Sequence, residues 1–217
     1  MKLTTPIATG NTADIYLADG HIVKVFTRRS KADVEHEAAN QEYTRWLGLP
    51  VPKVVEVTEH DGKPVLMMER VSGVPMKDLL MGDRDRVPAL LAKSVEVQRG
   101  VHGLAAPALR RMSDRLRQQI GSVVGLHEDE KSKLFSMLDE VGDETQLCHG
   151  DLHVQNLIVD GDDIAIIDWM DATRGNPLLD VCRTYVIYAE VDVGFAEMYL
   201  DEYCRESGVD AGDVLRW

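Results

Sequence analysis

The sequence predicts an α+β fold in two lobes: an N-terminal lobe built on an antiparallel sheet with one helix, and a C-terminal lobe made mainly of helices. Two observations carry this prediction. Strand-forming runs joined by Asp-Gly pairs fill the first seventy residues, and such pairs between apolar runs are a strong hairpin signal. Beyond the segment "SGVP", apolar residues recur at helical spacing instead. We therefore divide the chain into residues 1–70 and 71–217.

Two hairpins and one helix account for the N-terminal lobe. The run "DIYLADGHIVKVF" turns at residues 19–20, and "KVVEVTEHDGKPVLMMERV" turns at residues 61–62. Between them, "SKADVEHEAANQEYTRWLG" has the pattern of a helix. Ser30 and Asp33 are spaced as a capping box, and Gly48 is a typical stop.

The C-terminal lobe is predicted from stripes of apolar residues at helical spacing. The stripes are Leu90, Ser94, Val97 and Val101, then Leu116 and Ile120, then Leu134, Leu138 and Val141. A third hairpin, "LIVDGDDIAIID", interrupts the helices, which resume near Pro177.

Composition excludes several classes of protein. The 217 residues are 44% apolar and 28% charged, which is typical of a globular chain with a real core. No apolar run approaches the roughly 18–20 residues that span a bilayer, and the N-terminus lacks a signal-peptide pattern. The three cysteines are widely spaced, so the sequence predicts neither a disulfide framework nor a CxxC metal site, and we expect reduced thiols. The net charge of −13 disfavours nucleic acid and anionic membranes as partners. We expect a cytoplasmic protein.

Lys24, in the strand "HIVKVF", is a candidate for a buried charge. Period-two alternation places Ile22, Lys24 and Phe26 on one face, and a buried ammonium needs an anion. An exposed lysine on an edge strand is an equally good interpretation. The candidate partners on the following helix are Glu35, Glu37 and Glu42, and helical spacing alone does not choose among them.

The segment "HGDLHVQN" places dense polar groups between two strand-like runs. His149, Asp151 and His153 alternate, so on a strand they would share a face, as the ligands of a metallohydrolase do. Gly150 and the polar tail favour a loop instead. We keep the hydrolase as the weaker alternative.

The spacing of Asp151 and Asn156 is that of the protein-kinase catalytic loop, D-x-x-x-x-N. Asp168 follows Asn156 by twelve residues, at the end of a second strand, where kinases place a metal-binding aspartate. An asparagine carbonyl and a carboxylate are hard oxygen ligands suited to Mg²⁺, and a further carboxylate can accept the proton of a hydroxyl. The chain then enters a helix without an A-P-E activation segment, which favours small-molecule acceptors.

These segments resemble the aminoglycoside phosphotransferase and choline kinase superfamily, the small-molecule branch of the protein-kinase-like fold. "HGDLHVQN" and "IDWMDATRGNPLLDVCRTY" are similar to its catalytic and metal-site segments. "TGNTADIYLADGHIVKVF", "EHEAANQEYTRWLGLPVPKVVEV" and "MMERVSG" are similar to its nucleotide loop, its lysine and helix pair, and its hinge. The resemblance runs through almost the whole chain and implies the two-lobed protein-kinase-like fold, with nucleotide bound by residues 1–70 and catalysis in residues 71–217.

The resemblance also implies roles for individual residues. Asp151 would be the catalytic base, and Asn156 and Asp168 would bind Mg²⁺. Lys24 would contact the α- and β-phosphates of ATP and pair with Glu37. Asp180 would brace the catalytic loop. The remaining nucleotide contacts would come from the backbone at Gly10, Asn11 and Thr12 and from Met68, Glu69 and Val71.

The expected function is therefore transfer of the γ-phosphate of Mg-ATP to a hydroxyl of a small molecule, with the choice between ATP and GTP left open. The acidic segment "EVDVGFAEMYLDEY" and Asp171 favour a cationic acceptor, an amino sugar or an amino alcohol, although a solvated acidic helix explains that segment equally well. The alternative is a nucleotide-binding module without turnover. Such modules usually lack one of the catalytic residues, and here none is missing.

Overall fold

The structure, a computed structural model, describes residues 3–217. They form two compact units: the first contains the residues up to Leu79 together with Gln155–Asp171, and the second contains Leu80–Val154 and Ala172–Trp217. The predicted α+β fold, an antiparallel sheet followed by a mainly helical part, is confirmed. The hairpin of residues 155–171 packs with the first unit. The division after residue 70 into a nucleotide-binding part and a catalytic part therefore stays a prediction.

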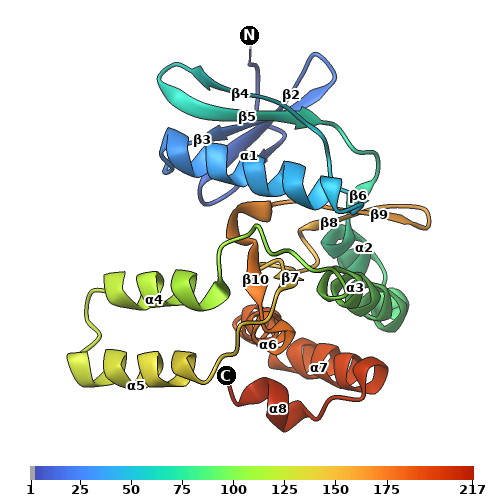
Figure 1. Ribbon diagram of the computed structural model, residues 1–217. Coiled ribbons are helices and arrows are strands. Elements are labelled where there is room, and N and C mark those ends of the chain that lie inside the picture. The colour runs from blue at the N-terminus through green and yellow to red at the C-terminus, as the bar shows by residue number, and fades with distance from the viewer. Residues whose placement is uncertain (1–2) are drawn as a thin grey trace. The chain divides into compact units, whose positions relative to one another are not determined.

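The first unit is built on a five-stranded antiparallel sheet in the order β1-β2-β3-β5-β4 (Figure 1). The strands are β1 (Ala8–Thr9), β2 (Ala13–Ala18), β3 (His21–Phe26), β4 (Val54–His60) and β5 (Lys63–Glu69). Both predicted hairpins are present, and both residues of each Asp-Gly pair have positive φ, as a type I′ turn requires.

Helix α1 (Lys31–Trp46) covers one face of this sheet (Figure 1). It begins with the predicted capping box, in which the Ser30 side chain accepts the Asp33 N–H and the Asp33 carboxylate accepts the Ser30 N–H. Phe26 of β3 packs with Val34 and Ala38 of the helix, whereas Val23 and Val25 pack with Val65 on the opposite face. The predicted alternation therefore directs Lys24, two residues before Phe26, toward α1.

A small antiparallel sheet completes the first unit, in the order β6-β8-β9. Its strands are β6 (Val74–Pro75), β8 (Leu157–Asp160) and β9 (Asp163–Ile166). The Ile166 N–H donates to the Pro50 carbonyl at 2.9 Å, which ties the hairpin to the loop before β4. Gly73 has φ of +106°, and a Cβ there would lie 2.3 Å from the Val159 carbonyl oxygen. Only glycine fits this approach of two backbones.

The second unit is mainly helical and contains the short antiparallel pair β7 and β10. Its elements, with α2 leading into it from the first unit, are α2 (Met76–Gly82), η1 (Arg84–Arg86), α3 (Val87–His102), α4 (Met112–Ser122), α5 (Glu128–Asp139), β7 (Gln146–Cys148), β10 (Thr173–Gly175), α6 (Pro177–Ala189), α7 (Val193–Ser207) and α8 (Ala211–Leu215). Helices α3, α6 and α7 pack together around buried side chains, and α4 and α5 form an antiparallel pair (Figure 1). In the first unit, η2 (Trp169–Asp171) follows β9 and packs against α1.

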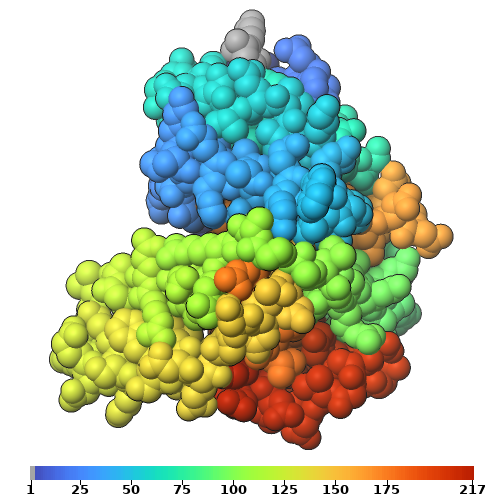
Figure 2. All heavy atoms as spheres, viewed as in Figure 1, coloured from blue at the N-terminus to red at the C-terminus, as the bar shows by residue number. Residues whose placement is uncertain are grey.

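Helices α4 and α5 are the least buried of the longer helices. Met112 is the buried residue of α4 and Leu138 that of α5, so the predicted stripes there are only half-covered. Figure 2 shows this pair as a broad green and yellow surface, and Val124 in the connection between the helices is fully exposed. Among the described residues, no helix combines the length and the apolar character that crossing a membrane requires.

Candidate active site

Lys24 of β3 lies between two carboxylates of the first unit. Its Nζ is 2.6 Å from Glu37 Oε1 and 3.1 Å from Asp168 Oδ1. The side chains of Lys24 and Glu37 are 11% and 1% exposed, whereas that of Asp168 is 40% exposed. Burial by itself would lower the pKa of Lys24, but the carboxylates of Asp168 and Glu37 outweigh burial and hold the pKa above its ordinary value. The ammonium is therefore charged and fixed in place.

Glu37 is the partner of Lys24 because of the face of α1 that it occupies. It shares that face with Val34, Ala38 and Gln41, all of which are buried. Glu35 points to solvent, and Glu42, also exposed, accepts the Val54 N–H at 2.8 Å. Helical spacing left these three glutamates open, and the docking of α1 on the sheet decides among them.

Asn156 and Asp168 lie at the open end of the β8–β9 hairpin. Leu157 pairs with Ile166, and the Ile167 N–H then donates to the Asn156 carbonyl at 3.0 Å, which places Asp168 one residue beyond this contact. Asp168 has φ of +67°, a left-handed conformation that aspartate tolerates better than most residues. Strained backbone of this kind often marks a functional position. An amide oxygen and a half-exposed carboxylate suit a hard cation such as Mg²⁺.

The residues predicted to contact the phosphates lie in the connection between β1 and β2. Gly10 and Asn11 are exposed and Thr12 is half-exposed. The Gly10 N–H already donates to the Ala13 carbonyl at 2.9 Å, and the Thr12 carbonyl accepts the Thr27 N–H at 2.9 Å. This connection is therefore an ordered turn, and a phosphate would have to replace the Gly10 bond or use other donors.

The residues predicted to contact the base lie at and beyond the end of β5. Met68 belongs to the core cluster under α1, and its sulfur lies 3.7 Å from Gln41 Nε2. The Glu69 N–H donates to the Lys53 carbonyl at 2.8 Å, while Val71 is half-buried in the connection toward β6. Their predicted contacts with nucleotide remain predictions.

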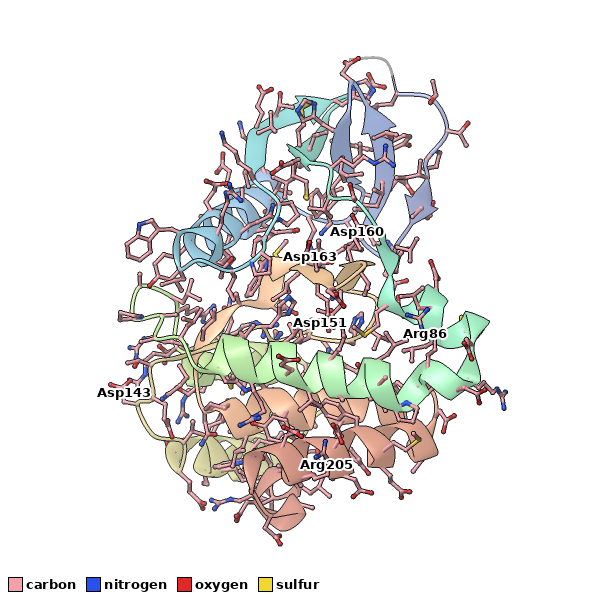
Figure 3. All side chains as sticks on the ribbon, turned by 90° about the vertical axis from the view of Figure 1, so that its right-hand side faces the viewer. Arg86, Asp143, Asp151, Asp160, Asp163 and Arg205 are labelled. Carbon is pink, nitrogen blue, oxygen red and sulfur yellow. The ribbon has the colours of Figure 1, made fainter. Side chains whose placement is uncertain are left out.

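Asp151 lies in the second unit, in the loop that follows β7 (Figure 3). One carboxylate oxygen is 3.5 Å from His153 Nε2, and the other is 3.7 Å from Arg183 Nη2. Burial by itself would raise the pKa of Asp151, but the hydrogen bond and charge of His153, with His149 and Arg183, hold it below its ordinary value. The group is therefore an ionised acceptor near neutral pH. Arg183 was not singled out by the sequence, because α6 brings it to this loop.

Asp180 of α6 accepts hydrogen bonds from the backbone of the same loop. It accepts the His149 N–H at 3.2 Å and the Gly150 N–H at 2.7 Å, and His102 Nε2 lies 2.9 Å away. Burial by itself would raise the pKa of Asp180, but the hydrogen bond and charge of His102, the charge of His149 and the Gly150 N–H hold it below its ordinary value. These are the contacts that a brace of the loop would make.

Sequence patterns did not single out His102 as part of the site. It ends α3, is buried, and its Nε2 lies 2.9 Å from Asp180 Oδ2. No signal in the sequence connects the two residues, which are 78 positions apart.

The metallohydrolase alternative is wrong for the histidines that suggested it. Residues 149–156 form a loop, so His149, Asp151 and His153 do not share the face of a strand. His149 is fully buried, and its Nδ1 accepts the Asp151 N–H at 3.3 Å.

One group of possible metal ligands occurs among residues 3–217. Ligand atoms of His102, Cys148 and Asp180 lie within 4.8 Å of one another, and all three residues are buried. Both oxygens of Asp180 already accept N–H groups, and burial raises the pKa of the Cys148 thiol far above its ordinary value. A neutral thiol and an occupied carboxylate favour packing over metal binding.

A scan of protein families matches residues 4–216 to a family described as "Phosphotransferase enzyme family". The resemblance found in the sequence is thereby confirmed. Among curated proteins, Protein LicA of Haemophilus influenzae is 30% identical over 81 residues, which make up 36% of this chain and 30% of LicA. This chain therefore matches less than a third of the length of that relative.

Solved structures share the fold. A thermostable mutant of aminoglycoside phosphotransferase APH(4)-Ia, in a ternary complex with AMP-PNP and hygromycin B, superposes with a TM-score of 0.71 at 18% identity, covering 97% of this chain and 80% of that one. An aminoglycoside-3'-phosphotransferase of type VIII superposes with a TM-score of 0.69 at 22% identity, covering 99% and 90%.

Proposed function

This chain belongs to the phosphotransferase enzyme family, and from that premise we propose that it transfers the γ-phosphoryl group of Mg-ATP to a hydroxyl of a small molecule. The observation that carries the proposal is the buried ammonium of Lys24 held 2.6 Å from Glu37 and 3.1 Å from Asp168. A fixed cation beside a half-exposed carboxylate provides a phosphate contact and a metal ligand together.

In the proposed reaction, residues of the first unit bind the nucleotide. Lys24 contacts the α- and β-phosphates, and Glu37 keeps its ammonium charged and oriented. Asn156 and Asp168 would hold Mg²⁺, which would supply neutralisation of charge on the phosphates. Asp168 pairs with Lys24 in this structure. With metal and nucleotide bound, Asp168 would contact the metal and Lys24 would contact the phosphates instead.

In the proposed reaction, Asp151 receives the acceptor hydroxyl. The ionised carboxylate accepts the proton of the acceptor hydroxyl while the hydroxyl oxygen forms a bond to the γ-phosphorus. The bond from that phosphorus to the bridging oxygen of ADP breaks, and ADP leaves. Because the transition state of phosphoryl transfer is usually loose, positioning and charge neutralisation supply most of the rate gain.

The acceptor class we favour is a hydroxylated amine, an amino sugar or an amino alcohol. The related phosphotransferase with hygromycin B supports this class by analogy. Two residues of the acidic segment "EVDVGFAEMYLDEY" have structural roles, since Asp192 caps α7 and Glu202 pairs with Arg205. Asp171, outside that segment, is the candidate to test first, and an unchanged KM for an amine substrate in Asp171→Asn would remove it.

The test is ADP release from Mg-ATP, and from Mg-GTP, across a panel of hydroxylated amines, sugars and aminoglycosides. Asp151→Asn serves as the blank, and Asp163→Asn, at the exposed turn of the β8–β9 hairpin, removes the same charge elsewhere. We expect acceptor-dependent release in the wild type and in Asp163→Asn but not in Asp151→Asn. Mg-ATP binding with no acceptor-dependent ADP release in any of the three proteins would favour the alternative, a nucleotide-binding module without turnover.

A further inference from the structure

Three side chains on one face of α6 hold the backbone of the catalytic loop. Asp180 accepts the Gly150 N–H at 2.7 Å, Thr184 Oγ1 donates to the Leu152 carbonyl at 2.9 Å, and the Val154 N–H donates to the Tyr188 hydroxyl at 3.1 Å. All three side chains belong to buried residues. The bonded loop residues are 150, 152 and 154, so the contacts enclose Asp151 on both sides.

The spacing of these contacts follows from the geometry of the two segments. Asp180, Thr184 and Tyr188 are four residues apart, a rise of about 6 Å along a helix for each step. Two residues of extended chain span at most about 6.8 Å. Each turn of α6 can therefore meet every second residue of a loop that runs beside it, and the loop is fixed at three points.

A second row of side chains, on α3, supports the first. Gln98 Nε2 donates to Thr184 Oγ1 at 3.2 Å, and His102 Nε2 lies 2.9 Å from Asp180 Oδ2. These two residues of α3 are also four apart and pair with α6 in reverse order, so the helices run in opposite directions here. Tyr199 of α7 donates its hydroxyl to Gln98 Oε1.

The protonation states suit these bonds. Burial raises the pKa of the Tyr188 and Tyr199 hydroxyls above their ordinary value, so both stay neutral. Thr184 Oγ1 accepts from Gln98, and its one proton faces the Leu152 carbonyl at 2.9 Å and the Asp180 carbonyl at 3.2 Å, so the shorter contact is the one to the loop. Breaking a bond would leave a buried partner unpaired, which is costlier than a lost surface contact.

We propose that Thr184 and Tyr188 are positioning residues for Asp151, fixing the carboxylate through the loop backbone, with Gln98 and His102 holding α6 side chains in register. The inference rests on the proposed function only for the role of Asp151. The three-point hold on the loop is independent of it. Both side chains bond to the backbone of the loop and would act on Asp151 through it.

The test uses Thr184→Val and Tyr188→Phe, which remove one hydroxyl each with little change in volume. Thr184→Ser restores the hydroxyl, and Tyr185→Phe removes a hydroxyl on the same helix that has no bond to the loop among the described residues. Turnover is followed as ADP release from Mg-ATP with the best acceptor of the panel, or with water as acceptor where hydrolysis is the only turnover. Amide hydrogen exchange is followed in peptides covering residues 149–156.

We expect Thr184→Val and Tyr188→Phe to lower kcat at least about tenfold, since a displacement of about 1 Å can cost about 10²-fold. KM for ATP should not change, exchange of the loop amides should rise, and Thr184→Ser and Tyr185→Phe should behave as the wild type. Wild-type kcat in both variants, or exchange that rises equally throughout the protein, would overturn the inference. If Asp151→Asn keeps full activity, the proposed function fails, and the exchange of the loop still decides whether α6 holds it.

Discussion

Lys24 and Asp168 are 144 positions apart in the chain, yet Lys24 Nζ lies 3.1 Å from Asp168 Oδ1. The contact joins the central strand region of the sheet to the end of the β8–β9 hairpin within one compact unit. Glu37 completes it from α1 at 2.6 Å. The residues proposed to bind phosphate and metal are thus already gathered without ligand.

Lys24→Met should lower the free energy of unfolding by about 3 kcal/mol or more, because it leaves the buried carboxylate of Glu37 without its partner. Urea denaturation measures the loss. Lys63→Met, at the exposed first residue of β5, is the control and should change stability little. Adding Glu37→Leu to Lys24→Met should recover part of the loss, and a double variant less stable than Lys24→Met would contradict the pairing.

Alanine substitutions of Asp151 and of Asp168 should have different effects on turnover and on nucleotide binding. Asp151→Ala should lower turnover about 10²- to 10⁴-fold, the usual contribution of a general base, and leave Mg-ATP affinity nearly unchanged. Asp168→Ala should weaken nucleotide binding that depends on Mg²⁺. Calorimetric titration with ATP, with and without Mg²⁺, separates the two, and equal loss of ATP binding in both variants would refute these separate roles.

Asp180 should make stability depend on acid pH. Its folded pKa lies below the unfolded value of about 3.9, so its contribution is fully present above that value and is lost as pH falls through the folded pKa. Denaturation of the wild type and Asp180→Asn at several pH values between about 2 and 5 should show the larger loss toward acid in the wild type. Parallel curves would mean that the pKa of Asp180 is not lowered.

Gly73→Ala should destabilise the protein by at least about 2 kcal/mol, since a methyl group would combine positive φ with a clash against the Val159 carbonyl. Gly62→Ala is the matched control. It also has positive φ, but open space surrounds the added carbon, so it should cost only about 1 kcal/mol. Equal thermal shifts in the two variants would show that β8 moves away from residue 73 without cost.

Local chemistry let the sequence determine several parts of this protein by itself. The Asp-Gly turns, the capping box at Ser30 and the alternation around Lys24 depend on neighbours within a few residues, and each is present in the structure. The spacing of Asp151, Asn156 and Asp168 could also be recognised in the sequence, because a single loop and a single hairpin contain all three.

Tertiary structure alone decided the rest. The choice of Glu37 over its neighbours depends on how α1 docks on the sheet, and the contacts of Arg183 with Asp151 and of His102 with Asp180 depend on where α6 and α3 lie. The hairpin of residues 155–171 joined the first unit for the same reason. These contacts link residues far apart in the chain, so they form only when packing of whole elements brings the side chains together, and no local pattern encodes them.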